Sequence, residues 1–391
     1  MFSPLINLAS RNSQKFFSLK RQRFDALTGL RAVAAAMVFV YHNRKFWYGW
    51  LPDPLMRFFN EFHLGVAVFF VLSGFVIGYT YNEKPLQSKA DYRKYILVRF
   101  ARIMPMYLIF VTLEFFRTGF PSGKEIIVAY TLTQGFFDDY ILNGLPQAWT
   151  LTVEMTFYIL APFLFFRLKK NISKTFFWLL LSLFISISIG MLLNHLHWNK
   201  AGFMIAPLMV LNNTFFGRFF EFGCGLFLSQ VILKQRSAGL FVKWKNQTLW
   251  GGLAVLFSIY LIALFQKQIY TNGGDTIGGA IIRNTLFALS MMIFIHGLLK
   301  ERTWVSRFLS TKVLVILGNA SFIFYLIHLK AVNYFFWYWH IFPDRNFCLL
   351  WIVSIAAYYL IERPLYDRMK RIIMGKKKVV AMDPLLAIQE K

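Results

Sequence analysis

Long apolar runs separated by short polar stretches extend along the chain from Leu27 to Leu365. A transmembrane helix needs about 20 mainly apolar residues, and ten runs in the sequence meet this requirement. The pattern therefore predicts an all-α fold, a polytopic membrane helix bundle with about ten transmembrane helices. The predicted spans are residues 27–46, 61–81, 96–116, 149–167, 175–193, 205–232, 248–266, 279–299, 313–336 and 347–365.

An eleventh apolar stretch, residues 125–142, contains Gly135 and ends in two aspartates. Cytoplasmic loops of membrane proteins carry an excess of Lys and Arg. If residues 125–142 do not cross the bilayer, the predicted cytoplasmic regions hold 31 of the 43 basic residues. If they do cross, the basic cluster at 167–174 and every later basic loop would face outward. We therefore predict ten spans with both termini in the cytoplasm, and interpret residues 117–148 as a partly buried or surface-lying outer loop.

This topology divides the chain into a basic N-terminal segment, residues 1–26, a transmembrane domain, residues 27–366, and a basic cytoplasmic tail, residues 367–391. The N-terminal segment lacks the uninterrupted apolar core of a cleavable signal peptide, so we expect it to remain in the mature protein.

Composition supports the membrane interpretation. The chain is 57% hydrophobic and 16% charged, whereas soluble domains are about 25% charged. The net charge of +25 comes from basic bursts between apolar runs, which favours membrane topology over nucleic-acid binding. The two cysteines suggest no disulfide framework, and no spacing typical of metal ligands occurs. We expect no metal and no nucleic-acid partner.

Ionisable residues within predicted spans are costly and are candidates for function. Arg31 and His42 are eleven residues apart in the first span. At 100° per residue they lie within about 20° of one helix face, separated by roughly 16 Å along the axis. An anionic group held by Arg31 near the cytoplasm could thus extend toward a base at His42. The alternative is that His42 is an ordinary interfacial residue, since a polar run follows it.

Two further sites show a similar ambiguity. Arg99 and Arg102 share a helix face at the start of the third span, and guanidinium groups suit phosphate oxygens. They could equally form a positive-inside cluster.

Glu154 is near the outer end of the fourth span, at a depth expected to match His42. A carboxylate beside an imidazole can orient it and stabilise its cation, so the two could act as one unit. The alternative is a structural pair.

Other polar residues in the spans have simpler interpretations. We expect Arg218 and Glu221 to pair with each other, three residues apart on one helix. His328 and Lys330 could line a cavity or be structural. The small pair Ser73-Gly74 most simply permits close helix packing.

Together these segments resemble the membrane-bound acyltransferase-3 family, whose best-known members O-acetylate bacterial surface polysaccharides. The resemblance extends from about Phe24 to Tyr366. The first span carries the family's R-x10-H motif and the third its R-x-x-R motif. The remaining matching segments are Phe69-Phe-Val-Leu-Ser73-Gly-Phe75, Trp149-Thr-Leu-Thr-Val-Glu154-Met-Thr-Phe-Tyr158, Leu317-Gly-Asn-Ala-Ser-Phe-Ile-Phe-Tyr325-Leu-Ile-His328 and Ile361-Glu-Arg-Pro364.

The resemblance implies a protein of the bacterial cytoplasmic (inner) membrane. It implies an acyl-CoA donor, most commonly acetyl-CoA, and no permanently bound cofactor. The acceptor would be a saccharide hydroxyl on a surface polysaccharide, lipopolysaccharide, exopolysaccharide or lipid-linked oligosaccharide. His42 and Glu154 would be catalytic. The substrate-binding residues would be Arg31, Ser73, Arg99, Arg102, Trp149 and Tyr158.

Two departures from the family pattern affect the side of the protein that would bind the acceptor. Lys330 stands where the family often has proline, and Thr28 where it commonly has aspartate.

Direct transfer and a covalent acyl-histidine intermediate are both compatible with the motifs. A transporter or flippase for a lipid-linked sugar or anion would also explain ten spans with buried charges. Transporters often show repeated halves and interrupted helices, and we find neither. A non-catalytic scaffold would not require the set of charged motifs.

Overall fold

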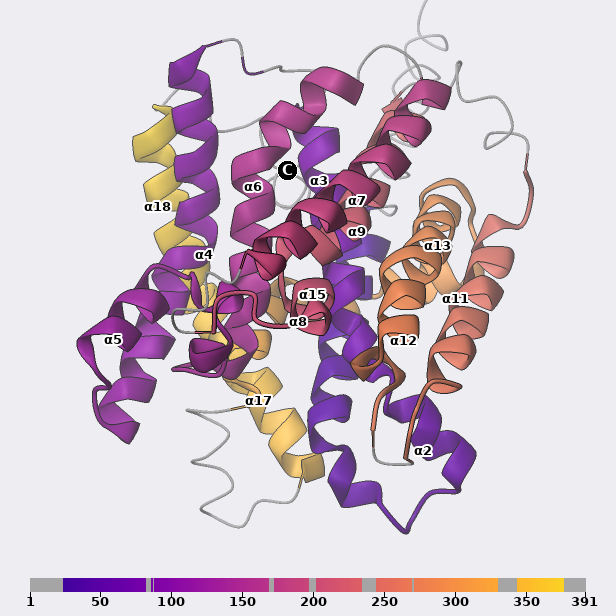
Figure 1. Cartoon of the computed structure of the whole chain (residues 1–391), viewed down its shortest axis with the longest axis horizontal. Coiled ribbons are helices and arrows are strands. Elements are labelled where there is room, and N and C mark those ends of the chain that lie inside the picture. Colours follow the sequence, from indigo (N-terminus) through magenta and orange to yellow (C-terminus); the bar gives the residue numbers. More distant parts are fainter. Residues whose placement is uncertain are drawn as a thin grey trace, which may run out of the picture.

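The computed structural model describes residues 24–81, 86, 88–168, 172–196, 202–233, 244–268, 271–329 and 343–375. In this part of the chain the protein is a bundle of helices without a named β-strand, as predicted (Figure 1). One isolated bridge joins Phe137 and Phe203. Most of the N-terminal segment, Lys330, and the end of the basic tail lie outside the described residues.

Each of the ten predicted spans overlaps a helical segment. The first helix is Phe24–Trp47. The others are α2 (Asp53–Phe59) with α3 (Gly65–Tyr81), α4 (Lys89–Thr118), α6 (Trp149–Leu168), α7 (Ile172–His195), α8 (Pro207–Asn213) with α9 (Phe215–Leu233), α11 (Gln247–Ala263), α12 (Ile277–Ile282) with α13 (Ala288–Lys300), α15 (Lys312–Ile327), and α17 (Pro343–Ala357) with α18 (Arg363–Met374). A short helix, α14 (Trp304–Leu309), precedes α15.

Seven of these segments are long and apolar enough to cross a membrane, and α11 and α15 are shorter apolar helices. The described residues therefore show a protein with several membrane-spanning helices. The number of ten and the cytoplasmic position of both termini remain predictions.

The stretch 125–142 does not form a long helix. It contains most of α5 (Gly123–Tyr130), followed by the 3-10 turns Gln134–Phe136 and Asp138–Tyr140. Eight residues of α-helix rise only about 12 Å, which is much less than the roughly 30 Å of a bilayer core. The segment is therefore too short to cross as a single helix.

The centre of the bundle depends on a close approach of α3 and α9. A Cβ atom on Gly74 would lie 2.1 Å from the carbonyl oxygen of Phe222, and one on Gly225 would lie 2.0 Å from that of Val71. Only glycine fits at either position. Small residues allow helix backbones to approach in this way within membranes, so Gly74 has the packing role predicted for the Ser73-Gly74 pair.

Two helices contain π-helical segments, Arg283–Phe287 between α12 and α13, and Tyr358–Glu362 between α17 and α18. Such bulges are rare and frequently occur at functional sites. Each of these segments contains a buried charged residue, Arg283 in the first and Glu362 in the second. In Figure 1, α18 lies beside α4 at one edge of the bundle, and Val98 and Ala101 of α4 pack against Tyr366 of α18.

Candidate active site

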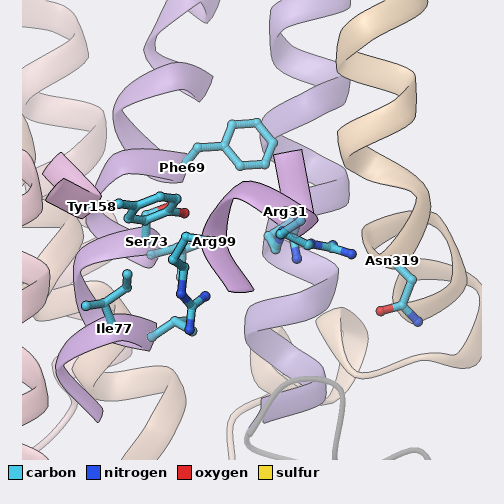
Figure 2. Close-up of a pocket in the computed structure, with 10 residues that line it drawn as sticks. Arg31, Phe69, Ser73, Ile77, Arg99, Tyr158 and Asn319 are labelled. Carbon is cyan, nitrogen blue, oxygen red and sulfur yellow. The ribbon is translucent and has the colours of Figure 1, made fainter. Parts of the chain in front are cut away.

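Five helices surround a cavity of about 90 Å³ in the bundle (Figure 2). It contains five of the eight predicted site residues. Arginines come from the first helix and α4, Ser73 from α3, and Tyr158 from α6. The complete lining is Arg31, Phe69, Leu72, Ser73, Val76, Ile77, Arg99, Arg102, Tyr158 and Asn319. We call this space the arginine cavity.

Arg99 is almost fully buried and is surrounded by aromatic rings. Its guanidinium carbon lies 5.5 Å from the ring centroid of Tyr81, 6.0 Å from that of Tyr95 and 5.8 Å from that of Tyr158. The electron-rich faces of aromatic rings attract cations at such distances. The three tyrosines can therefore hold the guanidinium at the wall of the cavity without neutralising its charge.

Arg102 has a different environment. Its Nη1 lies 2.6 Å from Oε1 of Glu362, which is buried, and its guanidinium lies 5.6 Å from the ring of Tyr366. Glu362 belongs to the family-like segment Ile361–Pro364, and no role was predicted for it from the sequence. Its signal was an acidic residue inside a predicted span, which is costly unless a partner is present. The π-helical segment that ends at Glu362 brings this carboxylate to Arg102.

The third arginine, Arg31, extends from the first helix on the Asn319 side of the cavity, opposite Arg99 and Tyr158 (Figure 2). It lies within electrostatic range of Arg102, Glu362 and Glu154. Three guanidinium groups thus gather near two carboxylates, which leaves an excess of positive charge beside an open space. This balance suits a ligand with phosphate groups.

Glu154 lies next to this cavity. Its Oε1 accepts a hydrogen bond of 2.6 Å from Ser73 Oγ and another from the hydroxyl of Tyr158. Ser73 and Tyr158 line the arginine cavity, whereas the ring neighbours of His42 are Tyr41 and His328. That Glu154 and His42 lie at a similar depth and act together stays a prediction.

A second, smaller cavity of about 50 Å³ adjoins the first. The two share Phe69 and Ser73 as lining residues. Glu154 and Tyr325 also line the second cavity, and the Tyr325 hydroxyl lies 2.9 Å from that of Thr150. Its lining is Val66, Phe69, Phe70, Ser73, Thr150, Leu151, Glu154, Ser321, Phe322 and Tyr325.

His42 is solvent-accessible and packs against a second histidine. Its ring centroid lies 5.2 Å from that of His328, and the His328 ring lies 5.4 Å from that of Tyr325. His328 is buried, and its Nδ1 lies 2.8 Å from the carbonyl oxygen of Tyr325. A nitrogen that donates to a carbonyl must carry hydrogen, so Nε2 is the basic nitrogen of this ring. His328 lines neither of the two cavities, and it packs between Tyr325 and His42.

Trp149, like His42, lines neither of these two cavities. It is the first residue of α6, is half-buried, and packs against the hydrophobic core. Its described position indicates a role in anchoring the helix that carries Glu154 and Tyr158. Among the described residues, no three His, Cys, Asp or Glu side chains gather as metal ligands would.

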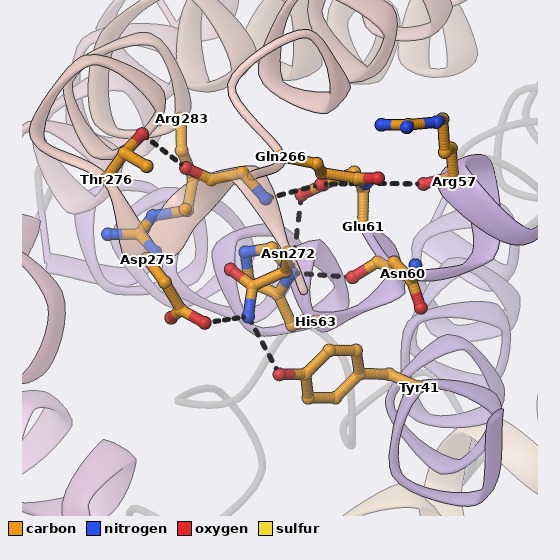
Figure 3. A network of polar contacts seen from close by, with 12 residues as sticks. Tyr41, Arg57, Asn60, Glu61, His63, Gln266, Asn272, Asp275, Thr276 and Arg283 are labelled. Carbon is orange, nitrogen blue, oxygen red and sulfur yellow. Dashed lines mark hydrogen bonds and ion pairs between the residues drawn. The ribbon is translucent and has the colours of Figure 1, made fainter. Parts of the chain in front are cut away.

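A polar network that includes Tyr41, the neighbour of His42, lies just beyond the C-terminal ends of α2 and α11 (Figure 3). Glu61 is fully buried, and its Oε1 accepts bonds of 2.6 Å from Gln266 Nε2 and 2.7 Å from the Gly273 amide. Asn272 donates to the hydroxyl of Tyr41 at 3.0 Å and to Asp275 at 2.8 Å. We call these residues, with His63, Asn212 and Arg283, the outer network.

The outer network reaches His42 through Tyr41. The Tyr41 ring lies 4.9 Å from the His42 ring and 5.4 Å from the His63 ring. On the far side, Arg283 Nη2 donates to Asn212 at 2.6 Å. These residues could not be singled out from the sequence because most of them lie outside the motif segments. A separate prediction is confirmed: Arg218 Nε lies 2.9 Å from Glu221 Oε2, both buried.

Comparison with known proteins places this arrangement in a family. The family model described as "Acyltransferase domain" (Acyl_transf_3) matches residues 24–362. The chain belongs to this family. The match ends at Glu362, the partner of Arg102, and it includes both cavities and the histidine pair.

Relatives within the curated proteins carry related names. The O-acetyltransferase OatA of Staphylococcus aureus (strain NCTC 8325 / PS 47) is 27% identical over 329 residues, which cover 78% of this chain and 50% of the relative. The acyltransferase MdmB of Streptomyces mycarofaciens is 26% identical over 338 residues, which cover 80% of each protein. The acyltransferase-3 chain described here thus spans about half the length of the first of these relatives. No solved structure matches.

Proposed function

We propose that this protein is an integral membrane O-acyltransferase of the bacterial inner membrane. It would move an acyl group, such as acetyl, from cytoplasmic acyl-CoA to a hydroxyl of an extracytoplasmic or lipid-linked saccharide. One observation carries the proposal: a cavity lined by three arginines shares lining residues with a second cavity, lined by Glu154 and Tyr325, and Tyr325 packs against His328 of the histidine pair. Membership of the acyltransferase family and the names of the relatives support it.

The donor would bind with its phosphate groups at the arginine cavity. Arg31 and Arg99 present guanidinium groups there, and Arg102 adds a third that Glu362 holds in place. Guanidinium forks bind phosphate oxygens through paired hydrogen bonds. The flexible pantetheine arm would then extend through the second cavity and span the roughly 16 Å that separates Arg31 from His42 along the helix.

The transfer itself would take place beside His42. The acceptor hydroxyl would lose its proton to a His42 ring nitrogen as its oxygen attacks the thioester carbonyl carbon. The carbon–sulfur bond would break, and the leaving CoA thiolate would take up the proton from the imidazolium. General-base assistance typically contributes about 10²–10⁴-fold. A covalent acyl-His42 intermediate would use the same residues, with the nitrogen attacking first.

Glu154 has a different role in this proposal from the one expected from the sequence. It accepts hydrogen bonds from Ser73 and Tyr158, which both line the arginine cavity. It would therefore fix the wall along which the donor passes. His328, packed on His42, is the group that the geometry favours as the neighbour of the base.

The test compares surface glycans of a deletion strain with those of its complemented strain. Acyl esters are released by mild alkali and measured per unit of polymer. We expect the deletion to lower the acyl content at unchanged polymer yield, and complementation to restore it. A loss of polymer at constant acyl content would instead support the flippase alternative. Unchanged glycans in both respects would contradict acyl transfer to a surface saccharide.

A further inference from the structure

A third cavity, of about 400 Å³, lies apart from the path described above, where α11 begins and α13 ends. Two short segments that flank these helices form most of it. The lining is Trp244, Lys245, Asn246, Gln247, His296, Lys300, Glu301, Arg302 and Thr303. The predicted topology places this end of the bundle on the cytoplasmic side of the membrane.

The cavity carries an excess of positive charge. Lys245, Lys300 and Arg302 contribute three cations, and Glu301 is the one acidic residue of the lining. Its two oxygens accept bonds of 2.6 Å and 2.9 Å from the amides of Gln247 and Thr248. The carboxylate is thus fixed at the start of α11, and the three basic side chains outnumber it around the cavity.

An exposed apolar stripe begins beside this cavity and follows α11. Large apolar side chains recur on one side of the helix every three or four residues, which is the spacing of one helix face. Each of them is about half exposed, and α11 lies at an edge of the bundle (Figure 1). The stripe consists of Leu249, Trp250, Leu253, Leu256, Phe257 and Tyr260.

Trp244 indicates that the mouth of the cavity lies at the level of the lipid headgroups. Its side chain is 47% exposed at the mouth of the cavity, and tryptophan is enriched at the level of lipid headgroups. Basic pockets on the cytoplasmic side of transmembrane helices bind the headgroups of anionic lipids. A soluble anion would use the cations alone, whereas a phospholipid would use both the cations and the stripe.

We propose that this cavity binds the headgroup of an anionic phospholipid. Its phosphate would contact Lys245, Lys300 and Arg302, and its acyl chains would lie along the α11 stripe. This site does not depend on the proposed transfer reaction.

Native mass spectrometry of the detergent-purified full chain tests the proposal. The probes are phosphatidylglycerol and phosphatidylcholine, and the variant is Lys245→Gln with Arg302→Gln. We expect a roughly 25-fold loss of phosphatidylglycerol affinity, since each basic residue near a membrane surface contributes a factor of about five. Phosphatidylcholine binding should change little. The charge-retaining variant Lys245→Arg with Arg302→Lys should keep most of the affinity and shows that the fold is intact.

The matched control removes the same charge from another exposed site, with Arg93→Gln and Lys94→Gln near the start of α4. An equal loss in the control would overturn the proposal in favour of diffuse attraction. A second variant, Leu253→Ser with Phe257→Ser, should weaken long-chain phosphatidylglycerol but leave glycerol phosphate unaffected. Displacement of the lipid by millimolar glycerol phosphate, or full affinity in the stripe variant, would assign the cavity to a soluble phosphate instead.

Discussion

The arginine cavity and the outer network both place charged groups within the bundle, yet they arrange them differently. In the arginine cavity, Arg102 pairs with Glu362, but three guanidinium groups still line an open space, and that of Arg99 has aromatic rings beside it. In the outer network, polar groups bond to one another, as Glu61 does to Gln266 and Asn272 does to Asp275. Charges kept beside a space can meet a ligand, whereas charges bonded together fix the positions of helices.

This difference predicts separate roles for the arginine cavity and the outer network. The arginine cavity would determine donor affinity. The outer network connects the α2–α3 corner with the segment before α12, and it holds Tyr41 against His42. It would mainly determine stability and the orientation of the base.

The largest effect should follow His42→Ala. Removing the base should lower acyl transfer by about 10²–10⁴-fold, while acyl-CoA binding at the arginine cavity remains. Transfer is measured with purified protein in liposomes, and binding by titration with a labelled acyl-CoA. His195→Ala, at the end of α7, is the control and should be fully active. Substantial transfer by well-folded His42→Ala protein would refute the mechanism.

Glu154→Gln should have the next largest effect. A hydrogen bond to a charged group contributes about 1.5–3 kcal/mol, so we expect a roughly 10- to 100-fold loss in transfer. Because Ser73 and Glu154 share a bond, the double variant with Ser73→Ala should be little worse than Glu154→Gln alone.

Combining Glu154→Gln with a change at His42 tests the sequence-based hypothesis that the two residues act as one unit. If Glu154 served His42 directly, the effects of Glu154→Gln and a partially active His42→Gln should not multiply. Because Glu154 accepts its hydrogen bonds from Ser73 and Tyr158, we expect the effects to multiply. Strong non-additivity would restore the imidazole–carboxylate unit.

Much of the fold could be predicted because apolar runs and basic loops report directly on membrane helices. The ten ranges each overlap a helix, and Arg218 pairs with Glu221 as spacing on one helix requires. Contacts between helices were harder to infer. The bond from Ser73 to Glu154 joins residues 81 positions apart, and the π-helical turn that brings Glu362 to Arg102 has no pattern in the apolar periodicity. Roles for Arg31, Arg99 and Arg102 remain predictions.

A smaller effect is expected for Arg99→Lys and Arg102→Lys. Lysine keeps the charge but loses the planar fork and its stacking on tyrosine rings. Each change should weaken acyl-CoA binding by roughly fivefold, because it removes one hydrogen bond of the fork to phosphate, which is worth about 1 kcal/mol. Arg117→Lys, at the other end of α4 and paired with Glu114, should leave the affinity unchanged. Normal binding by the double lysine variant would return the pair to a topological role.

Glu61→Gln tests the outer network and should affect stability more than donor binding. Glutamine can still accept bonds from Gln266 and Gly273, but without the charge these bonds weaken. The expected loss is about 1–2 kcal/mol, seen as a fall of a few degrees in the Tm of the detergent-solubilised protein. Acyl-CoA affinity should remain that of wild type. A normal Tm with lost transfer would instead identify Glu61 as an acceptor-binding residue.

The smallest effect concerns Asp275, which lies between α11 and α12 and is partly exposed. Burial raises the pKa of the Asp275 carboxyl above its ordinary value of 3.8. The folded protein therefore holds this proton at a pH where the unfolded chain has released it, so stability falls as pH rises between the two pKa values. Asp275→Asn keeps an acceptor for Asn272 and removes the titration. The Tm of the variant relative to wild type should thus increase by a degree or less as pH is raised from 4 through this interval and then remain level. A Tm difference that is constant from pH 4 upward would show that Asp275 adds no pH dependence. A lower Tm for the variant near neutral pH would mean that the charge itself stabilises the outer network through Arg283.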